Sequence, residues 1–361
     1  MAHLNLAVHS RILRSLAAAV LAVPLWIVPA RAEEVRIQVF GLFAPTEFRL
    51  RAEDSRILLV RAESGHARIE GRQTAECRVA AARVICQVEG HRIEGAFVEA
   101  LSEGAAAGFQ LAVPGKIERH FQGRLELTAA GRAMQAVVVM DREAAVRSIV
   151  AAESVPGAAL AALQAQAVVV RSYLLAGPRH ENFEFCDTTH CQFLRGPVGG
   201  DHPAGRATTA TQGLVLTYGG EVLRALYSRS CGGATQTLQQ AGLEAEGYPY
   251  FRVACESCRR EPEKWQAAFN RETIQPVLEQ PTEAKRLAVA RQHGWSQLPS
   301  ARFRFKTEGD SVVLDGTGIG HGIGLCQKGS ASLAAAGLDF GTILRHYFPN
   351  TRLDTLPHDS P

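Results

Sequence analysis

The sequence lacks a strong excess of charge of either sign. It carries 39 lysines and arginines against 36 aspartates and glutamates, which gives a formal net charge of +3 over 361 residues. The basic residues form no stripe, and this argues against nucleic acid as the main partner. So small a positive excess does not decide whether an anionic polymer is a partner.

Beyond one apolar run near its start, the sequence also lacks any long apolar stretch. The first run, Leu16–Val28, follows Arg11 and Arg14 and precedes Ala30–Ala32. A basic region, a short apolar stretch and a small-x-small site indicate a signal peptide over residues 1–32. A membrane anchor is the alternative, but the run is shorter than the ~20 apolar residues that a spanning helix needs. We therefore expect an exported, periplasmic or extracellular mature protein without a transmembrane span, in which disulfides can form.

Apolar residues make up 46% of the chain, which is enough to bury a core. The expected fold class is α+β. Residues 33–135 are expected to be β-rich, because apolar and polar residues alternate there with the period of half-buried strands. Residues 136–361 are expected to be a catalytic region that mixes helices with short strands. The clearest expected strands are Val35–Val39, Ile57–Val60, Val84–Val88 and Val137–Met140.

An acidic residue ends the apolar stripe of the first expected helix. A carboxyl group on such a stripe loses solvation, which raises its pKa and allows it to donate a proton near neutral pH. Glu153 is therefore the leading candidate for a catalytic acid. Alternatively, its side chain faces solvent or pairs with Arg147 or Arg171. The stripe, which begins after Arg142, consists of Val146, Ile149, Val150 and Glu153.

A second helix is expected with Pro156 in its first turn and its end at Gly177. It carries Arg171, whose guanidinium could hold a carboxylate or orient Glu153. An ordinary exposed helix face is the alternative interpretation of Arg171.

Two cysteines of the β-rich region are expected to form a disulfide. Cys77 and Cys86 flank a short segment that reads as two strands joined by a turn. Such a turn would place the two thiols opposite each other in an oxidising compartment.

The other six cysteines are open to several interpretations. Cys186 and Cys191, with His180 upstream, have the ligand types that zinc prefers, and they are the expected metal ligands. His190 is expected to point away from Cys191, because neighbours in an extended strand face opposite sides. Disulfides and free thiols remain alternatives for all six, and no Cys/His pair matches a protease pattern. Cys231, Cys255, Cys258 and Cys326 complete the set, and Cys255-x-x-Cys258 has zinc-ligand or redox spacing.

A glycine at every second position distinguishes the segment 318–324. In an expected strand, these glycines would let a backbone or a sugar ring approach closely, with His321 on the opposite face. The segment is not a phosphate loop, because it lacks the lysine that ends one. His321 could take part in catalysis or, alternatively, fix the backbone by hydrogen bonds.

The remaining expectations concern secondary structure. Residues 262–295 look helical, charged and peripheral. A Gly-Gly turn is expected to join strands Leu214–Tyr218 and Val222–Tyr227. Ser330–Ala336 is expected to be helical, and Asp339 is expected to cap a last helix through Tyr347.

Several motifs, in this order, resemble the stage II sporulation protein D (SpoIID/LytB) family. The resemblance covers Arg142 to Leu353, over half the chain. The motifs are Val150–Pro156, Ala165–Tyr173, Cys186–Gln192, Ser228–Gly233, Tyr248–Tyr250, Gly320–Gly329 and Ile343–Phe348.

The resemblance implies lytic cleavage of peptidoglycan glycan strands, especially strands stripped of their peptide stems by amidases. It implies that Glu153 is the catalytic glutamate and that zinc binds near Cys186. The sequence departs from the family pattern at Ser154, Gln164 and Arg252, where methionine, lysine and lysine are frequent, and this bears on substrate contacts more than on the acid. The implied substrate-binding residues are Arg171, Tyr173, Tyr250, Arg252, His321 and Gln327.

We therefore predict a lytic transglycosylase. Glu153 would protonate the glycosidic oxygen and then take a proton from the C6 hydroxyl of the same sugar, which gives an anhydro product without water. Most hydrolytic glycosidases need two carboxylates, and nothing in the sequence supports Asp187 or Asp315 as the second. The alternative is a non-catalytic glycan-binding protein that stimulates a cell-wall amidase, which would then be a second partner beside the glycan.

Overall fold

The structure is a computed structural model that describes residues 34–53, 56–102, 108–244 and 247–356. The expected signal peptide, residues 1–32, lies outside the described residues. No helix in the described part of the chain is long and apolar enough to cross a membrane.

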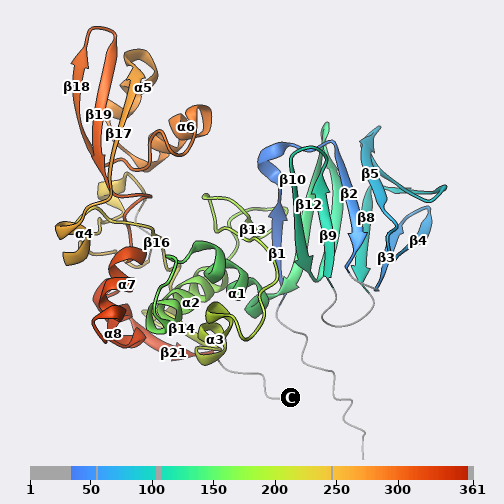
Figure 1. Cartoon of the computed structure of the whole chain (residues 1–361), viewed down its shortest axis with the longest axis horizontal. Coiled ribbons are helices and arrows are strands. Elements are labelled where there is room, and N and C mark those ends of the chain that lie inside the picture. The colour runs from blue at the N-terminus through green and yellow to red at the C-terminus, as the bar shows by residue number, and fades with distance from the viewer. Residues whose placement is uncertain (1–33, 54–55, 103–107, 245–246, 357–361) are drawn as a thin grey trace, which may run out of the picture. The chain divides into compact units, whose positions relative to one another are not determined.

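Two sheets, antiparallel except where β13 pairs with β1, face each other in the first part of the chain (Figure 1). Their inward side chains form one core, in which residues such as Ile37, Phe48 and Leu50 are buried while their neighbours in sequence are more exposed. The first sheet has the order β13 (Phe185–Cys186), β1 (Glu34–Val39), β12 (Ala133–Asp141), β11 (Arg124–Ala130), β8 (Phe97–Ser102), β3 (Ile57–Ala62), β4 (Gly65–Glu70). The second has the order β10 (Ile117–Gln122), β9 (Gly108–Val113), β2 (Glu47–Ala52), β5 (Ala75–Ala80), β6 (Arg83–Val88), β7 (His91–Gly95).

The period-two pattern predicted the strands of this region well. The four expected strands correspond to β1, β3, β6 and β12, and the α+β fold class is confirmed. Strand β12 continues through residue 135 to Asp141, so the sheet extends past the expected regional boundary. Cys77 on β5 and Cys86 on β6 are paired across the ladder and form a disulfide with an S–S distance of 2.03 Å.

Two helices follow β12 directly. Asp141 caps α1 (Arg142–Glu153), because its carboxylate accepts a hydrogen bond from the Ala144 amide at 2.8 Å. The second helix, α2 (Leu160–Leu175), begins later than Pro156, which the sequence had placed in its first turn. The intervening residues form a turn in which Gly157 has a φ of 73°, a conformation that favours glycine.

Helix α2 is buried on two sides. One side, which includes Leu163 and Val170, packs in the core of the two sheets, and the other, which includes Val168 and Val169, packs in a second core. A helix that is apolar all round is expected to be buried in this way. Helix α2 therefore joins the β-rich part to the rest of the chain.

The second core is built from short elements around α2. The expected strand Val222–Tyr227 is wrong, because only its two ends are in strands and its middle is not. The expected last helix is confirmed, with Asp339 as its cap at 2.9 Å from the Thr342 amide. These elements are α3 (Pro203–Ala210), β14 (Leu214–Tyr218), β15 (Glu221–Val222), β16 (Tyr227–Ser228), α4 (Glu256–Arg260), β20 (Leu325–Cys326), α7 (Gln327–Ala335), α8 (Phe340–Tyr347) and β21 (Arg352–Thr355).

A separate small module occupies residues 264–317. Its sheet has the order β17 (Lys264–Asn270), β19 (Ser311–Thr317), β18 (Phe303–Glu308), with helices α5 (Arg271–Glu279) and α6 (Glu283–His293). The helical expectation for this segment is wrong over β17, where Ala267 and Phe269 alternate inward into the module's own core. That core makes the module an insertion between two parts of the second core.

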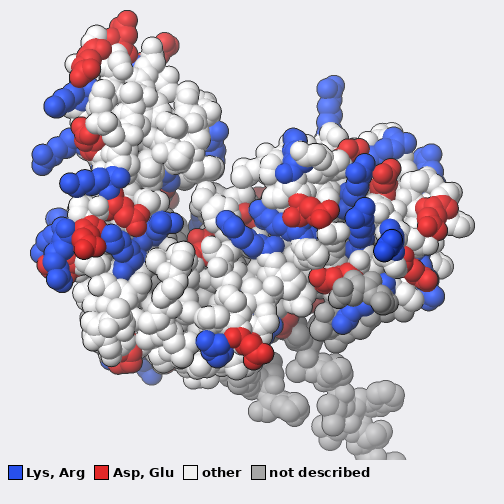
Figure 2. Space-filling model, in the orientation of Figure 1, with Lys and Arg blue, Asp and Glu red and all other residues white. Residues whose placement is uncertain are grey.

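Charges are mixed over the visible surface. Figure 2 shows acidic side chains among the basic ones over both the sheets and the helical part of this face. This agrees with the near balance of charge in the sequence.

Candidate active site

Glu153 is the last residue of α1, and its carboxyl is enclosed by protein although the residue is partly exposed. Burial raises the pKa of this carboxyl above its usual range. Three groups oppose that shift: the Phe193 amide, which donates to Glu153 Oε1 at 2.8 Å, the Tyr227 hydroxyl and the Arg195 guanidinium. Desolvation outweighs them, and the carboxyl therefore keeps its proton to a higher pH than a solvated glutamate.

Gln327 binds the main chain of Glu153. Its Nε2 donates to the Glu153 carbonyl at 2.8 Å and lies 3.5 Å from Gln166 Oε1 on α2. The carbonyls at the end of a helix have no partner within the helix, so this bond satisfies one of them. This bond and its buried side chain favour a positioning role for Gln327, and its expected substrate contact stays a prediction.

The loop after Cys191 is fastened to α1. The Ser148 hydroxyl accepts hydrogen bonds from the amides of Arg195 and Gly196 at 3.3 and 3.2 Å. These bonds hold the loop against the helix, and this places the Phe193 amide beside the Glu153 carboxyl.

Several buried polar atoms near this carboxyl have no hydrogen-bond partner among the described residues. Tyr227 Oη forms no bond of ordinary geometry, although it is close enough to Glu153 to affect its pKa. Both polar atoms of the Gln192 amide are also unpaired. Buried polar groups usually have partners, so such atoms are candidates for contacts with a ligand or water. A shallow hollow between the α1–α2 turn and α7 holds three more, Ser154 Oγ, Gln166 Nε2 and Ser330 Oγ.

Arg171 is placed differently from the expectation. Its side chain is 1% exposed, and its guanidinium makes two bonds to the Glu143 carboxylate at 2.5 and 2.7 Å and one to the Leu214 carbonyl at 3.0 Å. A buried guanidinium with these partners joins α1, α2 and β14, and it is not available to a substrate. This geometry favours an architectural role for Arg171, and the expected substrate contact stays a prediction.

The other expected substrate-binding residues are dispersed. Tyr173 is buried, with its ring 5.6 Å from that of Phe185. Tyr250 is buried as well, and its hydroxyl donates to the Arg224 carbonyl and accepts from the Leu226 amide at 3.0 Å. These contacts favour structural roles for both tyrosines, and their expected substrate contacts stay predictions. Arg252 is exposed.

His321 fixes the backbone of its own loop. Its Nδ1 accepts a hydrogen bond from the Ile323 amide at 3.1 Å, and its carbonyl accepts one from Gln236 at 2.5 Å. Burial lowers the pKa of the imidazole, which favours the neutral form that can accept such a bond. The alternative of a structural histidine thus agrees better with this geometry than a role in catalysis.

The glycine-rich segment 318–324 is not a strand. All four alternating glycines have φ between 68° and 90°, which side chains rarely adopt. A Cβ on Gly324 would lie 2.1 Å from the Leu226 carbonyl oxygen. The expectation of a pleated strand is therefore wrong, since the glycines are required by left-handed backbone and close packing.

The expected metal ligands converge, and a fourth residue joins them. The ligand atoms of His180, Cys186, His190 and Cys191 all lie within 4.8 Å of one another. His190 was expected to face away, but residues 188–191 form a turn, closed by a bond from the Cys191 amide to the Thr188 carbonyl at 3.0 Å. This turn brings His190 Nδ1 to 3.4 Å from Cys191 Sγ. Two thiols and two imidazoles form a donor set that fits zinc.

A second group of possible metal ligands lies in the second core. The sulfur atoms of Cys231, Cys255, Cys258 and Cys326 also lie within 4.8 Å of one another, and all four residues are buried. The sequence left their state open, and the structure places them together as a group that could hold a metal ion.

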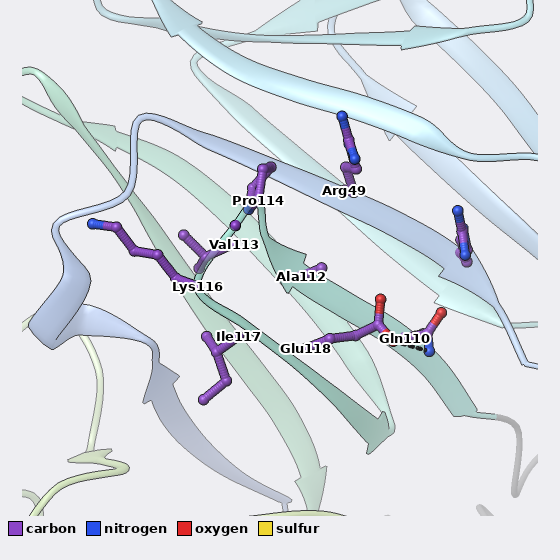
Figure 3. Close-up of a pocket in the computed structure, with 10 residues that line it drawn as sticks. Arg49, Gln110, Ala112, Val113, Pro114, Lys116, Ile117 and Glu118 are labelled. Atoms are coloured by element: carbon purple, nitrogen blue, oxygen red, sulfur yellow. Dashed lines mark hydrogen bonds between the residues drawn. The ribbon is translucent and has the colours of Figure 1, made fainter.

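A larger hollow lies elsewhere, on the second sheet between β2, β9 and β10 (Figure 3). Arg49, Arg51 and Lys116 line it together with Gln110 and Glu118. None of the site residues expected from the sequence lines this hollow, so it is separate from Glu153.

Sequence reasoning missed several groups around Glu153. The Phe193 amide carries no side-chain signal at all, and Tyr227 and Arg195 lie far from Glu153 in sequence. In the sequence, the one indication that this loop belongs to the site was that Phe193 directly follows the Cys186–Gln192 motif.

The fold and this geometry define an α+β protein with a buried helix-end glutamic acid and two thiol-rich groups. The family model described as stage II sporulation protein, SpoIID, matches residues 130–218, which contain Glu153. An uncharacterized protein of Brachyspira hyodysenteriae (strain ATCC 49526 / WA1) is 23% identical over 261 residues, 63% of this chain and 70% of that protein. Stage II sporulation protein D of Bacillus subtilis (strain 168) is 24% identical over 172 residues, 41% of this chain.

These matches show that residues 130–218 are similar to the SpoIID family. The similarity supports a role related to the cell wall. The match covers 50% of the B. subtilis protein, so the chain spans half the length of that relative.

Proposed function

We propose that this chain is an exported lytic transglycosylase that cleaves peptidoglycan glycan strands, with Glu153 as its general acid and base. The observation that carries the proposal is the buried Glu153 carboxyl with its raised pKa. A carboxyl that keeps its proton towards neutral pH can protonate a leaving glycosidic oxygen. The association of the SpoIID family with cell-wall degradation supports glycan as the substrate class.

The reaction requires two proton transfers at one residue. Glu153 gives its proton to the glycosidic oxygen as the bond from that oxygen to C1 breaks. The resulting carboxylate then removes the proton of the C6 hydroxyl in the same sugar as its oxygen bonds to C1. The products are an anhydro-ended strand and a free hydroxyl end, Glu153 is protonated again, and no water is consumed. Between the two steps, the Phe193 amide and the Tyr227 hydroxyl stabilise the carboxylate.

The surroundings of Glu153 favour a reaction with one carboxylate. Hydrolytic glycosidases pair two carboxyl groups at roughly 5–9.5 Å. In the described part of the chain, the groups that act most strongly on the Glu153 pKa are an amide, a tyrosine and an arginine, without a second acid.

The two aspartates considered as partners are engaged elsewhere. Asp187 accepts bonds from Arg119 at 3.0 Å and from the Phe40 amide at 3.3 Å. Asp315 lies on the exposed hairpin of the inserted module, where it accepts a bond from Gln266 at 2.9 Å. Both arrangements support the transglycosylase over a hydrolase.

Two groups near the acid would contact the glycan: Arg195, which is exposed, and Gln192, which is buried but has no hydrogen-bond partner among the described residues. Arg195 is exposed and close enough to Glu153 to affect its pKa, so it could bind an anionic group of a muramic acid. The unpaired amide of Gln192 could bind sugar hydroxyl or acetamido groups. These two residues replace Arg171 and Tyr250 as the proposed substrate contacts.

The group of His180, Cys186, His190 and Cys191 would hold one zinc ion with a structural role. Four protein ligands close the coordination sphere, as in structural zinc sites. The ion would fix the turn that precedes Gln192 and Phe193, and thereby the amide that binds Glu153.

The proposal is tested with Glu153→Gln on purified glycan strands stripped of peptide stems. Glutamine keeps the shape of the side chain and can still accept the hydrogen bond from the Phe193 amide. It cannot donate a proton to the substrate and then accept one back. We expect cleavage to fall at least 10³-fold, in the upper range for general acid–base catalysis, while the fold is retained. Wild-type activity should decline at high pH as Glu153 ionises. Mass spectrometry should detect anhydro-ended fragments from the wild type.

Glu308→Gln is the matched control, because Glu308 is an exposed glutamate of the inserted module. It should cleave as the wild type does. Cleavage by Glu153→Gln at the wild-type rate would refute the assignment of the acid. A wild-type protein that releases no anhydro ends and yet accelerates a cell-wall amidase would establish the glycan-binding alternative.

A further inference from the structure

Four cysteines from three separate parts of the chain meet at one point. Cys231 follows β16, Cys255 and Cys258 lie at α4, and Cys326 ends β20. Their four sulfur atoms lie within 4.8 Å of one another, and the sulfurs of Cys258 and Cys326 are 3.5 Å apart. A single zinc ion with bonds of about 2.3 Å to four sulfurs places those sulfurs about 3.8 Å apart. The spacing thus suits one tetrahedral ion.

Donor groups surround the sulfurs. Cys326 Sγ accepts bonds from the amides of Cys231 and Gly329, each at 3.4 Å. The second of these amides belongs to the first turn of α7, and the positive end of a helix favours a thiolate. Ser230 Oγ lies 3.5 Å from Cys258 Sγ, and Tyr347 Oη lies 3.6 Å from Cys255 Sγ. Such bonds offset the negative charge of a metal bound by four thiolates.

We propose that Cys231, Cys255, Cys258 and Cys326 bind one zinc ion as a structural tetrathiolate site. This site is distinct from the His180–Cys191 group and does not depend on the proposed reaction. Gly329 also agrees with a tightly enclosed site, because a Cβ there would lie 2.5 Å from Cys255 Sγ and 2.0 Å from Tyr347 Oη.

Other uses of four cysteines explain this geometry less well. Two disulfides need two pairs of close sulfur atoms, but they do not require that all four sulfur atoms lie around one point. They also do not require that backbone amides donate hydrogen bonds to one of these sulfurs. Packing as small apolar residues does not need donors either. An iron–sulfur cluster inserts several iron and sulfide ions between the thiolates, which requires wider spacing than one ion does.

The site lies at the base of the inserted module. The chain enters that module just after Cys258 and α4, and it returns through the glycine-rich segment to Cys326. Arg302, which precedes β18, donates to the Cys231 carbonyl at 2.6 Å, and the Gly318 amide donates to the Glu263 carbonyl at 2.8 Å. The ion would therefore clamp both ends of the insertion and fix Gln327, the residue after Cys326.

The test begins with the full chain purified without chelator. Elemental analysis should find one zinc more per chain in the wild type than in Cys231→Ser or Cys258→Ser. Cys186→Ser with Cys191→Ser is the matched control, because it removes two buried or half-buried thiols of the other group and should leave the tetrathiolate zinc in place.

Thiol titration of the wild type avoids dependence on any variant. After denaturation with a chelator, all six cysteines outside the Cys77–Cys86 disulfide should react. Peptide mapping that finds a disulfide among the four cysteines would overturn the proposal. So would a zinc content that is unchanged in both single variants, or iron bound at the four thiolates in place of zinc.

Discussion

At the scale of single residues, Glu153 is set apart by what surrounds its carboxyl. It ends α1 on the same stripe as Val146, Ile149 and Val150, which are buried. The stripe brings the acid to the edge of a core, and the loop around Phe193 then covers it. Its pKa is raised because this covering removes more stabilisation of the charge than the nearby donors restore.

This raised pKa predicts how Glu153→Gln changes stability with pH. The native pKa lies above the unfolded value, so the stability that Glu153 contributes is complete below about pH 4.5 and is lost as the pH rises through its native pKa. The loss is about 1.4 kcal/mol for each unit by which the native pKa exceeds the unfolded one. Glutamine does not ionise. Urea unfolding from about pH 4 to 8 should therefore show the variant gaining stability relative to the wild type.

Glu308→Gln controls for the loss of one charge. Its free energy of unfolding should change with pH, over the same range, as that of the wild type does. A wild type that gains stability over Glu153→Gln with rising pH would mean that the native pKa is not raised.

At the scale of elements, α1 and α2 are held by one ion pair as well as by apolar packing. Glu143 lies in the first turn of α1, and Arg171 lies three turns into α2, where it also binds the carbonyl of Leu214 on β14. A buried charge that loses its partner is costly, so the pair constrains the approach of three elements.

We expect Arg171→Ala to destabilise the protein by on the order of 3 kcal/mol, because it leaves the Glu143 carboxylate and the Leu214 carbonyl without their partner. Chemical denaturation would measure the shift. Arg119→Ala offers a comparison, since Arg119 is more exposed and pairs with Asp187 in another place. An Arg171→Ala protein as stable as the wild type, but with weaker glycan binding, would restore the substrate role implied by the family resemblance.

At the scale of the whole molecule, the parts of the chain are joined by α2, which lies in both large cores. The small module has a core of its own and enters and leaves at the cysteine group. A disulfide in the β-rich part agrees with an oxidising compartment, and it supports the proposal of export.

Export predicts a defined mature end. Expression with the native N-terminus should yield periplasmic or secreted protein that begins at Glu33, because Ala30–Ala32 is the expected cleavage site of the proposed signal peptide. N-terminal sequencing of that fraction is the measurement. Replacing Ala30 and Ala32 by bulkier residues should block processing. Recovery of only the intact Met1 form in the cytoplasm would exclude export.

The sequence by itself determined the local features of this protein. Alternation predicted β1, β3, β6 and β12, helical spacing placed Glu153 on a buried stripe, and an acidic cap set the start of the last helix. Each of these features depends on residues that lie close together in the sequence. Such patterns arise from backbone geometry and the burial of one face, which a few neighbouring residues specify.

Only the tertiary structure decided which distant groups meet. Cys231 and Cys326 are 95 residues apart, and Arg171 is 28 from Glu143, so no local pattern relates them. The Phe193 amide reaches Glu153 because a turn and a serine bond place its loop there. His190 joins the metal ligands for the same reason, since the turn at 188–191 cancels the alternation that an extended strand would impose. Long-range contacts of this kind follow from how cores pack, and that packing is a property of the whole chain.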